Sequence, residues 1–130
     1  MDRNKFKSPD EWFKQASYDL DTAGAMFETG RYIYTIFMCH LSIEKALKGL
    51  YTKQLKKPPP KTHDLNYLSE LINLNLSDEL QKFLDGLNDL SVPTRYPDEL
   101  DKLLKQYKKD RVEKMLTQTE GLLLWLKKKL

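Results

Sequence analysis

Apolar residues recur at steps of three and four along most of the chain, which is the spacing of one face of an α-helix. No sustained alternation of apolar and polar residues, the pattern of a half-buried strand, accompanies this spacing. The sequence therefore predicts an all-α protein, an up-and-down antiparallel bundle of four main helices with one or two short helices. Because 130 residues are the size of one domain, we expect a single domain over residues 1–130.

The first two helices have clear boundaries in the sequence. Ser8 is a suitable N-cap for a first helix, and that helix is expected to stop at Gly30. A second helix is expected from about Arg31 to about Leu55, where three consecutive prolines follow and exclude a continuing helix. The part from Tyr32 to Leu41 is apolar on nearly every side, so this helix is predicted to be the central one of the bundle.

The second half of the chain predicts shorter elements. A third helix is expected after Thr62, and a fourth helix is expected to be capped by Ser77. The segment from Val92 to Pro97 holds two prolines and is predicted to be a loop. Asp110 is predicted to cap the last helix.

The net charge of +3 conceals a strong block structure. Residues 45–61 contain six lysines and no acidic residue, and residues 102–130 contain nine basic and three acidic residues. Residues 77–101 have the opposite balance, with two basic and seven acidic residues. This alternation can steer an anionic partner toward one face. The lysines near expected helix C-termini can equally serve only to offset the helix dipoles, and both interpretations stay open.

Cellular location and metal chemistry are constrained by what the sequence contains. The start of the chain has no apolar signal region, and the longest apolar run, Leu122 to Leu126, is far shorter than the roughly 20 residues that span a bilayer. The single cysteine, Cys39, cannot form an intramolecular disulfide and is interpreted as an inert small hydrophobic residue. We therefore expect a cytoplasmic protein with no membrane partner, no metal site and no cofactor.

Two short segments carry candidate chemistry early in the chain. Glu44 and Lys48 are four residues apart, in the order that favours an ion pair on a helix, and form either a polar island facing a ligand or a surface salt bridge. His63 stands at an expected helix start, where it can lie near a bound anion. The neighbouring Asp64 can instead serve only as a helix cap. His40, in the most apolar stretch, is expected to be a buried and hydrogen-bonded core residue.

A third candidate lies between the two later prolines. Arg95 and Tyr96 are adjacent, and a loop arginine beside an aromatic residue can bind a phosphate and stack on a base. Bidentate phosphate binding favours arginine over lysine. The alternative is that Tyr96 fills the end of the bundle while Arg95 is solvated.

Five segments in this order along the chain resemble the HEPN domain family, over roughly residues 10–128. They are Trp12 with Ala16, Asp19, Leu20 and Ala23; Glu44-Lys45-Ala46-Leu47-Lys48; Thr62-His63-Asp64-Leu65; Arg95-Tyr96-Pro97-Asp98; and Tyr107 before the last helix. The resemblance implies a five-helix bundle that is usually a homodimer and has a proposed nucleotide-binding role. Many prokaryotic members resemble the partner of a minimal nucleotidyltransferase, in what is often a toxin–antitoxin-like pair.

Other family members are metal-independent ribonucleases, and their signature is an arginine followed after four to six residues by a histidine. Counted from Arg95, those positions here are Leu100, Asp101 and Lys102, and none is a histidine. The resemblance therefore favours a non-catalytic module that binds a nucleotide, an RNA or a nucleotidyltransferase partner. Its expected ligand contacts are Arg95, Tyr96, Lys45, Lys48, His63 and Asp64. The alternative is a ribonuclease with a divergent site made of Arg95, His63 and Glu44.

Overall fold

The computed structural model describes residues 6–130, and all of its regular elements are α-helices. The all-α prediction is therefore confirmed. None of the helices in this range is long and apolar enough to cross a membrane. The helices are α1 (Pro9–Glu28), α2 (Tyr32–Leu55), α3 (Leu65–Leu71), α4 (Asp78–Asp89), α5 (Ser91–Arg95), α6 (Leu100–Gln106) and α7 (Lys109–Lys127).

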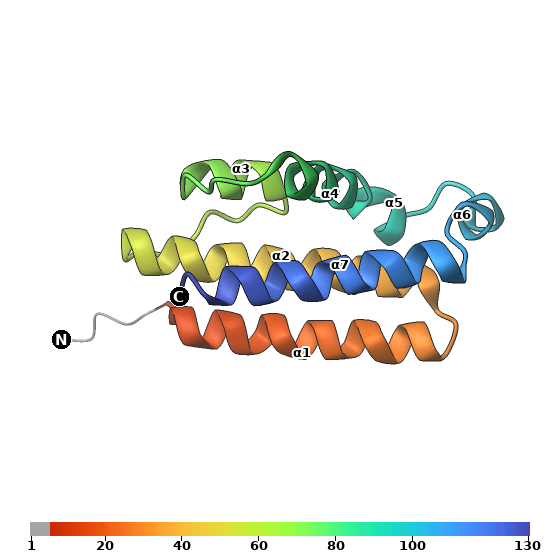
Figure 1. Ribbon diagram of the computed structural model, residues 1–130, viewed down its shortest axis with the longest axis horizontal. Coiled ribbons are helices and arrows are strands. Elements are labelled where there is room, and N and C mark those ends of the chain that lie inside the picture. The colour runs from red at the N-terminus through yellow and green to blue at the C-terminus, as the bar shows by residue number, and fades with distance from the viewer. Residues whose placement is uncertain (1–5) are drawn as a thin grey trace.

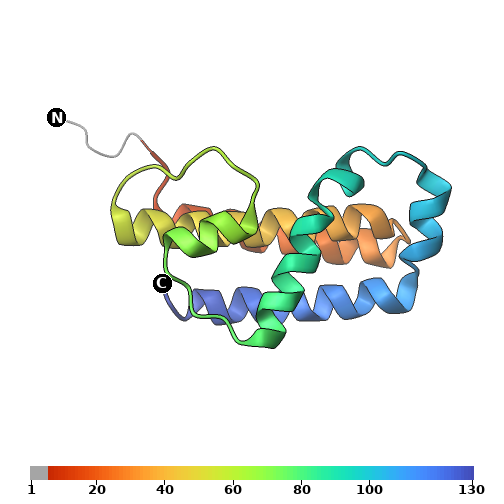
Figure 2. The ribbon, with the colours of Figure 1, turned by 90° about the horizontal axis from the view of Figure 1, so that it is seen from above.

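Three long helices, α1, α2 and α7, lie along the length of the molecule, and each packs against the other two (Figure 1). Helices α2 and α7 run in the same direction, and α1 runs opposite to both. Helices α3, α4 and α5 form a second layer over α2, with α4 crossing the long helices, and α6 lies at one end (Figure 2). Helix α2 contacts each of the other six helices, which confirms the prediction that it is the central one.

Local sequence signals explain where the first and fourth helices begin. The Ser8 hydroxyl accepts a hydrogen bond from the Glu11 amide at 3.1 Å, and the Ser77 hydroxyl accepts one from the Leu80 amide at 3.2 Å. Both residues satisfy amide groups that have no partner inside the helix. Gly30 has φ +77°, a conformation that glycine adopts without steric cost, and it separates α1 from α2 as predicted.

Two predicted boundaries are wrong. The segment from Val92 to Pro97 is not entirely a loop, because residues Ser91–Arg95 form helix α5. Pro93 fits there because the amides of a first helical turn have no intrahelical acceptor, so its missing N–H costs no hydrogen bond. Asp110 does not cap α7. The helix begins at Lys109, and Asp110 lies in its first turn, where a carboxylate interacts favourably with the dipole.

The interface between α1 and α2 is formed by small residues on α1. Ala16 and Ala23 are fully buried, and the Ser42 hydroxyl of α2 donates a hydrogen bond to the Ala16 carbonyl at 2.7 Å. Trp12 and Leu20 of α1 are only partly buried, so they lie at the margins of this interface. The short side chains let the two backbones approach closely, which fixes the position of the polar residues farther along α2.

Gly49 of α2 marks the closest approach to α1. A Cβ atom at this position would lie 2.9 Å from Phe13 Cδ2 and 3.0 Å from Trp12 Cβ, inside normal contact distances. Because the Phe13 ring is buried and cannot move freely, Gly49→Ala is expected to lower the free energy of unfolding by about 1–3 kcal/mol in chemical denaturation. Gly24→Ala is the matched control. It meets nothing within 4 Å and should raise stability by about 0.5–1 kcal/mol. Equal effects of the two changes would contradict this account of the interface.

Candidate functional site

Glu44 is the centre of a buried polar cluster on α2. Its side chain is 4% exposed, and its carboxylate accepts hydrogen bonds from Lys48 Nζ at 3.0 Å and from His63 Nδ1 at 3.0 Å. His40 Nδ1 lies 3.8 Å from the same carboxylate. We call His40, Glu44, Lys48 and His63 the Glu44 cluster. The Glu44–Lys48 pair is therefore part of the interior and not a surface salt bridge.

The two residues that precede α3 have different environments. The side chain of His63 is 56% exposed. Since a carboxylate only accepts hydrogen bonds, Nδ1 must carry the proton, and Nε2 of the neutral ring keeps a free lone pair. Asp64 caps α3, because its carboxylate accepts hydrogen bonds from the amides of Asn66 at 3.0 Å and Tyr67 at 3.2 Å. The capping role weighed for Asp64 is thus observed.

His40 is buried as predicted, with 1% of its surface exposed, but neither ring nitrogen makes the expected hydrogen bond within residues 6–130. Burial lowers the pKa of His40 below its usual 6.5, and the negative charge of Glu44 and the His63 backbone oppose this decrease. The ring is therefore neutral at pH 7. The adjacent Cys39 is inert, because burial raises the pKa of its thiol to about 11.

The lowered pKa of His40 predicts a loss of stability in acid. As the pH falls below about 6.5, the unfolded chain binds a proton at this histidine more readily than the folded chain does. The free energy of unfolding should then decrease, by no more than about 1.4 kcal/mol per pH unit from this group. Urea denaturation between pH 7 and 5 measures the slope. His40→Gln should remove part of it, and an unchanged slope in that variant would contradict the assignment.

Lys45 forms a second ion pair, between α1 and α2. Its Nζ lies 2.9 Å from the carboxylate of Asp19, which is 8% exposed. Two of the predicted phosphate ligands, Lys45 and Lys48, are therefore already neutralised by carboxylates of this chain. Their role as ligand contacts stays a prediction.

Arg95 ends α5 and has no acidic partner in the part of the chain that the structure describes. Its guanidinium lies 5.1 Å from the centre of the Phe37 ring of α2, and no carboxylate in residues 6–130 lies within 4.0 Å of it. Tyr96 is 72% exposed, so it does not fill the end of the bundle. The guanidinium is thus positioned by an aromatic ring, and its charge is available to a ligand.

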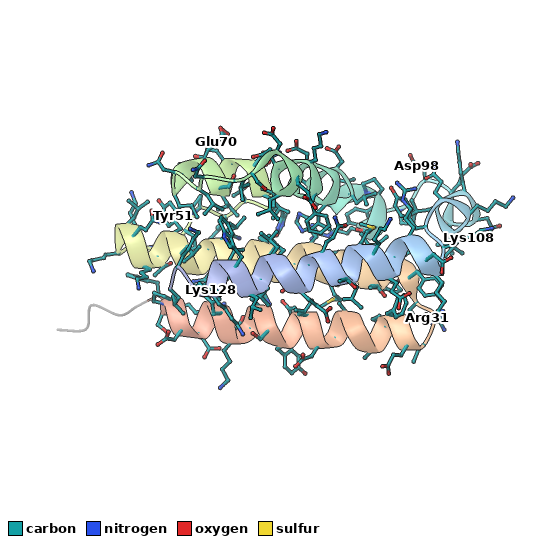
Figure 3. All side chains as sticks on the ribbon, viewed as in Figure 1. Arg31, Tyr51, Glu70, Asp98, Lys108 and Lys128 are labelled. Carbon is teal, nitrogen blue, oxygen red and sulfur yellow. The ribbon has the colours of Figure 1, made fainter. Side chains whose placement is uncertain are left out.

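Arg95 lines a pocket of about 320 Å³ at the end of the molecule where α2 begins. We call it the arginine pocket. Arg31 also lines it, and this residue lies far from Tyr51 and Lys128 in Figure 3. The remaining lining residues are Gly30, Tyr32, Ile33, Tyr34, Thr94, Pro97, Leu100 and Leu104.

The start of α2 contributes positive charge to this pocket. Arg31 is the N-cap, its side chain makes no capping hydrogen bond, and the first turn contains no acidic residue. The partial positive charge of the 24-residue helix is therefore added to the charges of two arginines. Arg31, like Arg95, has no carboxylate within 4.0 Å in residues 6–130. Arg31 is not among the predicted ligand contacts, although a basic residue at a helix start without a capping side chain is visible in the sequence.

The arginine pocket and the Glu44 cluster lie along one face of α2. Phe37, His40, Glu44 and Lys48 follow one another at steps of three and four residues, so their side chains share that face. The step of seven positions from Phe37 to Glu44 corresponds to roughly 10 Å along the helix. Burial is the main cause of the lowered pKa of His40, and the charge of Arg95 lowers it further, in keeping with a position of His40 near the guanidinium.

The model of the HEPN domain matches residues 9–130 of this chain. The chain belongs to the HEPN family. It is similar to the crystal structure of TT1696 from Thermus thermophilus, with a TM-score of 0.80 and 24% sequence identity over 94% of this chain and 98% of that chain. It is also similar to ST0689, an archaeal HEPN homologue, with a TM-score of 0.73 and 26% identity over 94% of this chain and 97% of that chain. No curated protein is significantly similar to it.

This HEPN chain departs from the ribonuclease signature in a defined part of the fold. The positions at which the signature has its histidine are Leu100, Asp101 and Lys102, which lie in the first turn of α6. Leu100 is 54% exposed and lines the arginine pocket. Within residues 6–130, no group of three or more histidine, cysteine, aspartate or glutamate side chains is arranged to hold a metal ion.

Proposed function

We propose that this HEPN protein is a non-catalytic module that binds the phosphate of a nucleotide in the arginine pocket. The observation that carries the proposal is the presence of two arginines, Arg31 and Arg95, at an N-terminus of α2 that lacks a capping side chain. Neither arginine has an acidic partner among the described residues 6–130. Helix N-termini and guanidinium groups both favour phosphate, because each offers N–H donors and positive charge. A bound phosphate would pair with two guanidinium groups that have no carboxylate within 4.0 Å in residues 6–130.

The pocket also suits the nucleoside part of such a ligand. Its volume of about 320 Å³ is in the range of small-molecule sites. Tyr34 in the pocket wall is 57% exposed, and Tyr96 beside Arg95 is 72% exposed. Exposed aromatic rings next to arginines offer surfaces on which a base can stack. We assign Tyr96 the base contact that the sequence predicts.

The remaining predicted contacts extend the proposal along α2. A ligand longer than a mononucleotide would contact four further residues: His63, Lys48, Lys45 and Asp64. Each of them would first have to exchange its present hydrogen bond or ion pair for one to the ligand. That exchange costs more for the buried Lys48 than for the exposed His63. A short RNA is therefore expected to reach His63, and a mononucleotide is expected to occupy the arginine pocket alone.

Isothermal titration calorimetry with ATP, GTP and a short RNA tests this function. The proposal expects heat of binding with at least one mononucleotide, and weaker binding as salt is raised. Absence of heat with all three ligands would overturn the nucleotide assignment. Titration at two salt concentrations separates a specific site from general attraction to a protein of net charge +3.

The expected protein partners also belong to this proposal. The family resemblance supports a homodimer, and a separately encoded minimal nucleotidyltransferase as a further partner. A chain that binds nucleotide phosphate without catalysing a reaction suits such a pairing, because the partner would supply the chemistry. Sedimentation of the chain alone and with the product of a neighbouring nucleotidyltransferase gene tests both partners. A monomer at all concentrations would contradict the homodimer.

A ribonuclease is the second candidate function, and one observation favours it. The buried Glu44 carboxylate holds His63 by Nδ1 at 3.0 Å, so the free Nε2 of an exposed histidine can accept a proton from a 2′-hydroxyl. Arg95 would then stabilise negative charge on the phosphate. Incubation of the protein with labelled RNA tests this candidate. It requires cleavage that His63→Asn abolishes, and intact RNA would exclude it.

A further inference from the structure

Two lysine clusters that are far apart in the sequence meet at one end of the molecule. Helices α2 and α7 run in the same direction, so their C-termini lie together (Figures 1 and 2). Lys53 Nζ donates a hydrogen bond to the Leu130 carbonyl, which joins the two ends directly. We call the six lysines at this end the lysine pole. They are Lys53, Lys56, Lys57, Lys127, Lys128 and Lys129.

We propose that the lysine pole binds the phosphate backbone of a nucleic acid, independently of the arginine pocket. In Figure 3 Lys128 lies toward the same end as Tyr51, and Arg31 lies at the opposite end of the molecule. The two surfaces are therefore separate. The proposal does not require that the arginine pocket binds a nucleotide.

The positive charge at the lysine pole is larger than the partial negative charge of the helix C-termini there. All six lysines are exposed, and none lies within 4.0 Å of a side-chain carboxylate of residues 6–130. Lys53 donates to the main-chain oxygen of Leu130, so the other five have their charge most fully available. The C-termini of two helices contribute only about one unit of negative charge together. Asp10 and Glu11, at the start of α1, contribute two more. After the helix dipoles and these two carboxylates are offset, several positive charges of the pole therefore remain for an external anion.

The composition of the pole favours a nucleic acid over an acidic protein. Its cations are all lysines, and lysine is depleted in protein–protein interfaces, where arginine and aromatic residues provide the anchors. Flexible exposed ammonium groups are instead suited to the continuous charge of a phosphate backbone, which they contact without reading sequence. Lys129 Nζ lies 4.3 Å from the centre of the half-buried Trp125 ring, so an aromatic face also borders the pole.

Fluorescence anisotropy with a labelled 20-nucleotide RNA of mixed sequence tests the proposal. The wild-type protein should bind, and the logarithm of its affinity should fall with the logarithm of salt concentration with a slope of about −4, as expected for six phosphate contacts to a single strand. The triple variant Lys127→Gln, Lys128→Gln, Lys129→Gln should reduce the slope to about −2 and weaken binding about tenfold or more at low salt.

A matched control separates the pole from overall charge. Lys105→Gln, Lys108→Gln, Lys109→Gln removes the same charge from exposed residues around the start of α7, at the other end of the helix, and should change affinity less than about twofold. Circular dichroism of each variant verifies that the helices are intact.

Three outcomes would overturn the proposal. These are no RNA binding at low salt, equal losses in the two triple variants, and binding of poly-glutamate as tight as that of RNA. The last result would assign the pole to an acidic protein partner. RNA binding that is weakened in the pole variant and kept in the control variant supports the proposal, whether or not the arginine pocket binds ATP.

Discussion

Replacing Glu44 by glutamine is expected to lower the free energy of unfolding by about 3–5 kcal/mol, because it leaves the ammonium of a buried lysine without its countercharge. Lys48 is 8% exposed, and its Nζ lies 3.0 Å from the Glu44 carboxylate. The same carboxylate also holds His63. A glutamine keeps the shape of the side chain but loses the charge, so the change isolates the electrostatic contribution.

Urea denaturation of a small set of variants measures this effect. Glu70→Gln, at an exposed position, is the matched control and should change stability by less than about 0.5 kcal/mol. The double variant Glu44→Gln, Lys48→Met removes both charges and should recover much of the loss. If Glu44→Gln were as stable as Glu70→Gln, the Glu44 cluster would not be the buried ion pair described above.

Replacing Arg95 by glutamine is expected to weaken ATP binding by about 10- to 100-fold. The change removes a charge-assisted, bidentate contact to phosphate, and such hydrogen bonds contribute about 1.5–3 kcal/mol. Arg31→Gln should have a similar effect, because both guanidinium groups line the arginine pocket. The protein should remain folded, since neither arginine has a carboxylate partner within residues 6–130.

Arg111→Gln provides the comparison for this second prediction. Arg111 is also stacked on an aromatic ring, 4.3 Å from the centre of Tyr107, but it lies outside the arginine pocket. Its loss removes the same charge and should leave the Kd for ATP within about twofold of the wild-type value. Equal weakening by Arg95→Gln and Arg111→Gln would mean that ATP responds to net charge and not to this pocket.

The helices and the central position of α2 could be predicted from the sequence, because they follow from local spacing. Ser8 and Ser77 mark helix starts within three residues of the amides they cap, and the apolar surface of Tyr32–Leu41 requires burial on several sides. Pro93 misled the prediction, because a proline is compatible with both a loop and a first helical turn.

The candidate site could be predicted only in part, because its contacts join distant segments. Glu44 and Lys48 form the same i, i+4 pattern whether they are buried or exposed, and His63 approaches from 19 residues away. The arginine pocket depends on the position of α5 beside the start of α2, which places Arg95 and Arg31 on one pocket. The spacing of apolar residues indicates which face of a helix is buried, but it does not indicate which other helix packs against that face. The extent of the single domain, the cytoplasmic location and the homodimer stay predictions.

The central claim is that nucleotide phosphate binds between Arg31 and Arg95, and backbone NMR during an ATP titration tests it most directly. We predict saturable chemical-shift changes for the amides of Gly30 to Tyr34 and of Thr94 to Leu104. The amides of Lys53 to Lys57 at the lysine pole should change little with a mononucleotide. No saturable change, or changes confined to the Glu44 cluster or to the lysine pole, would contradict the assignment of the arginine pocket.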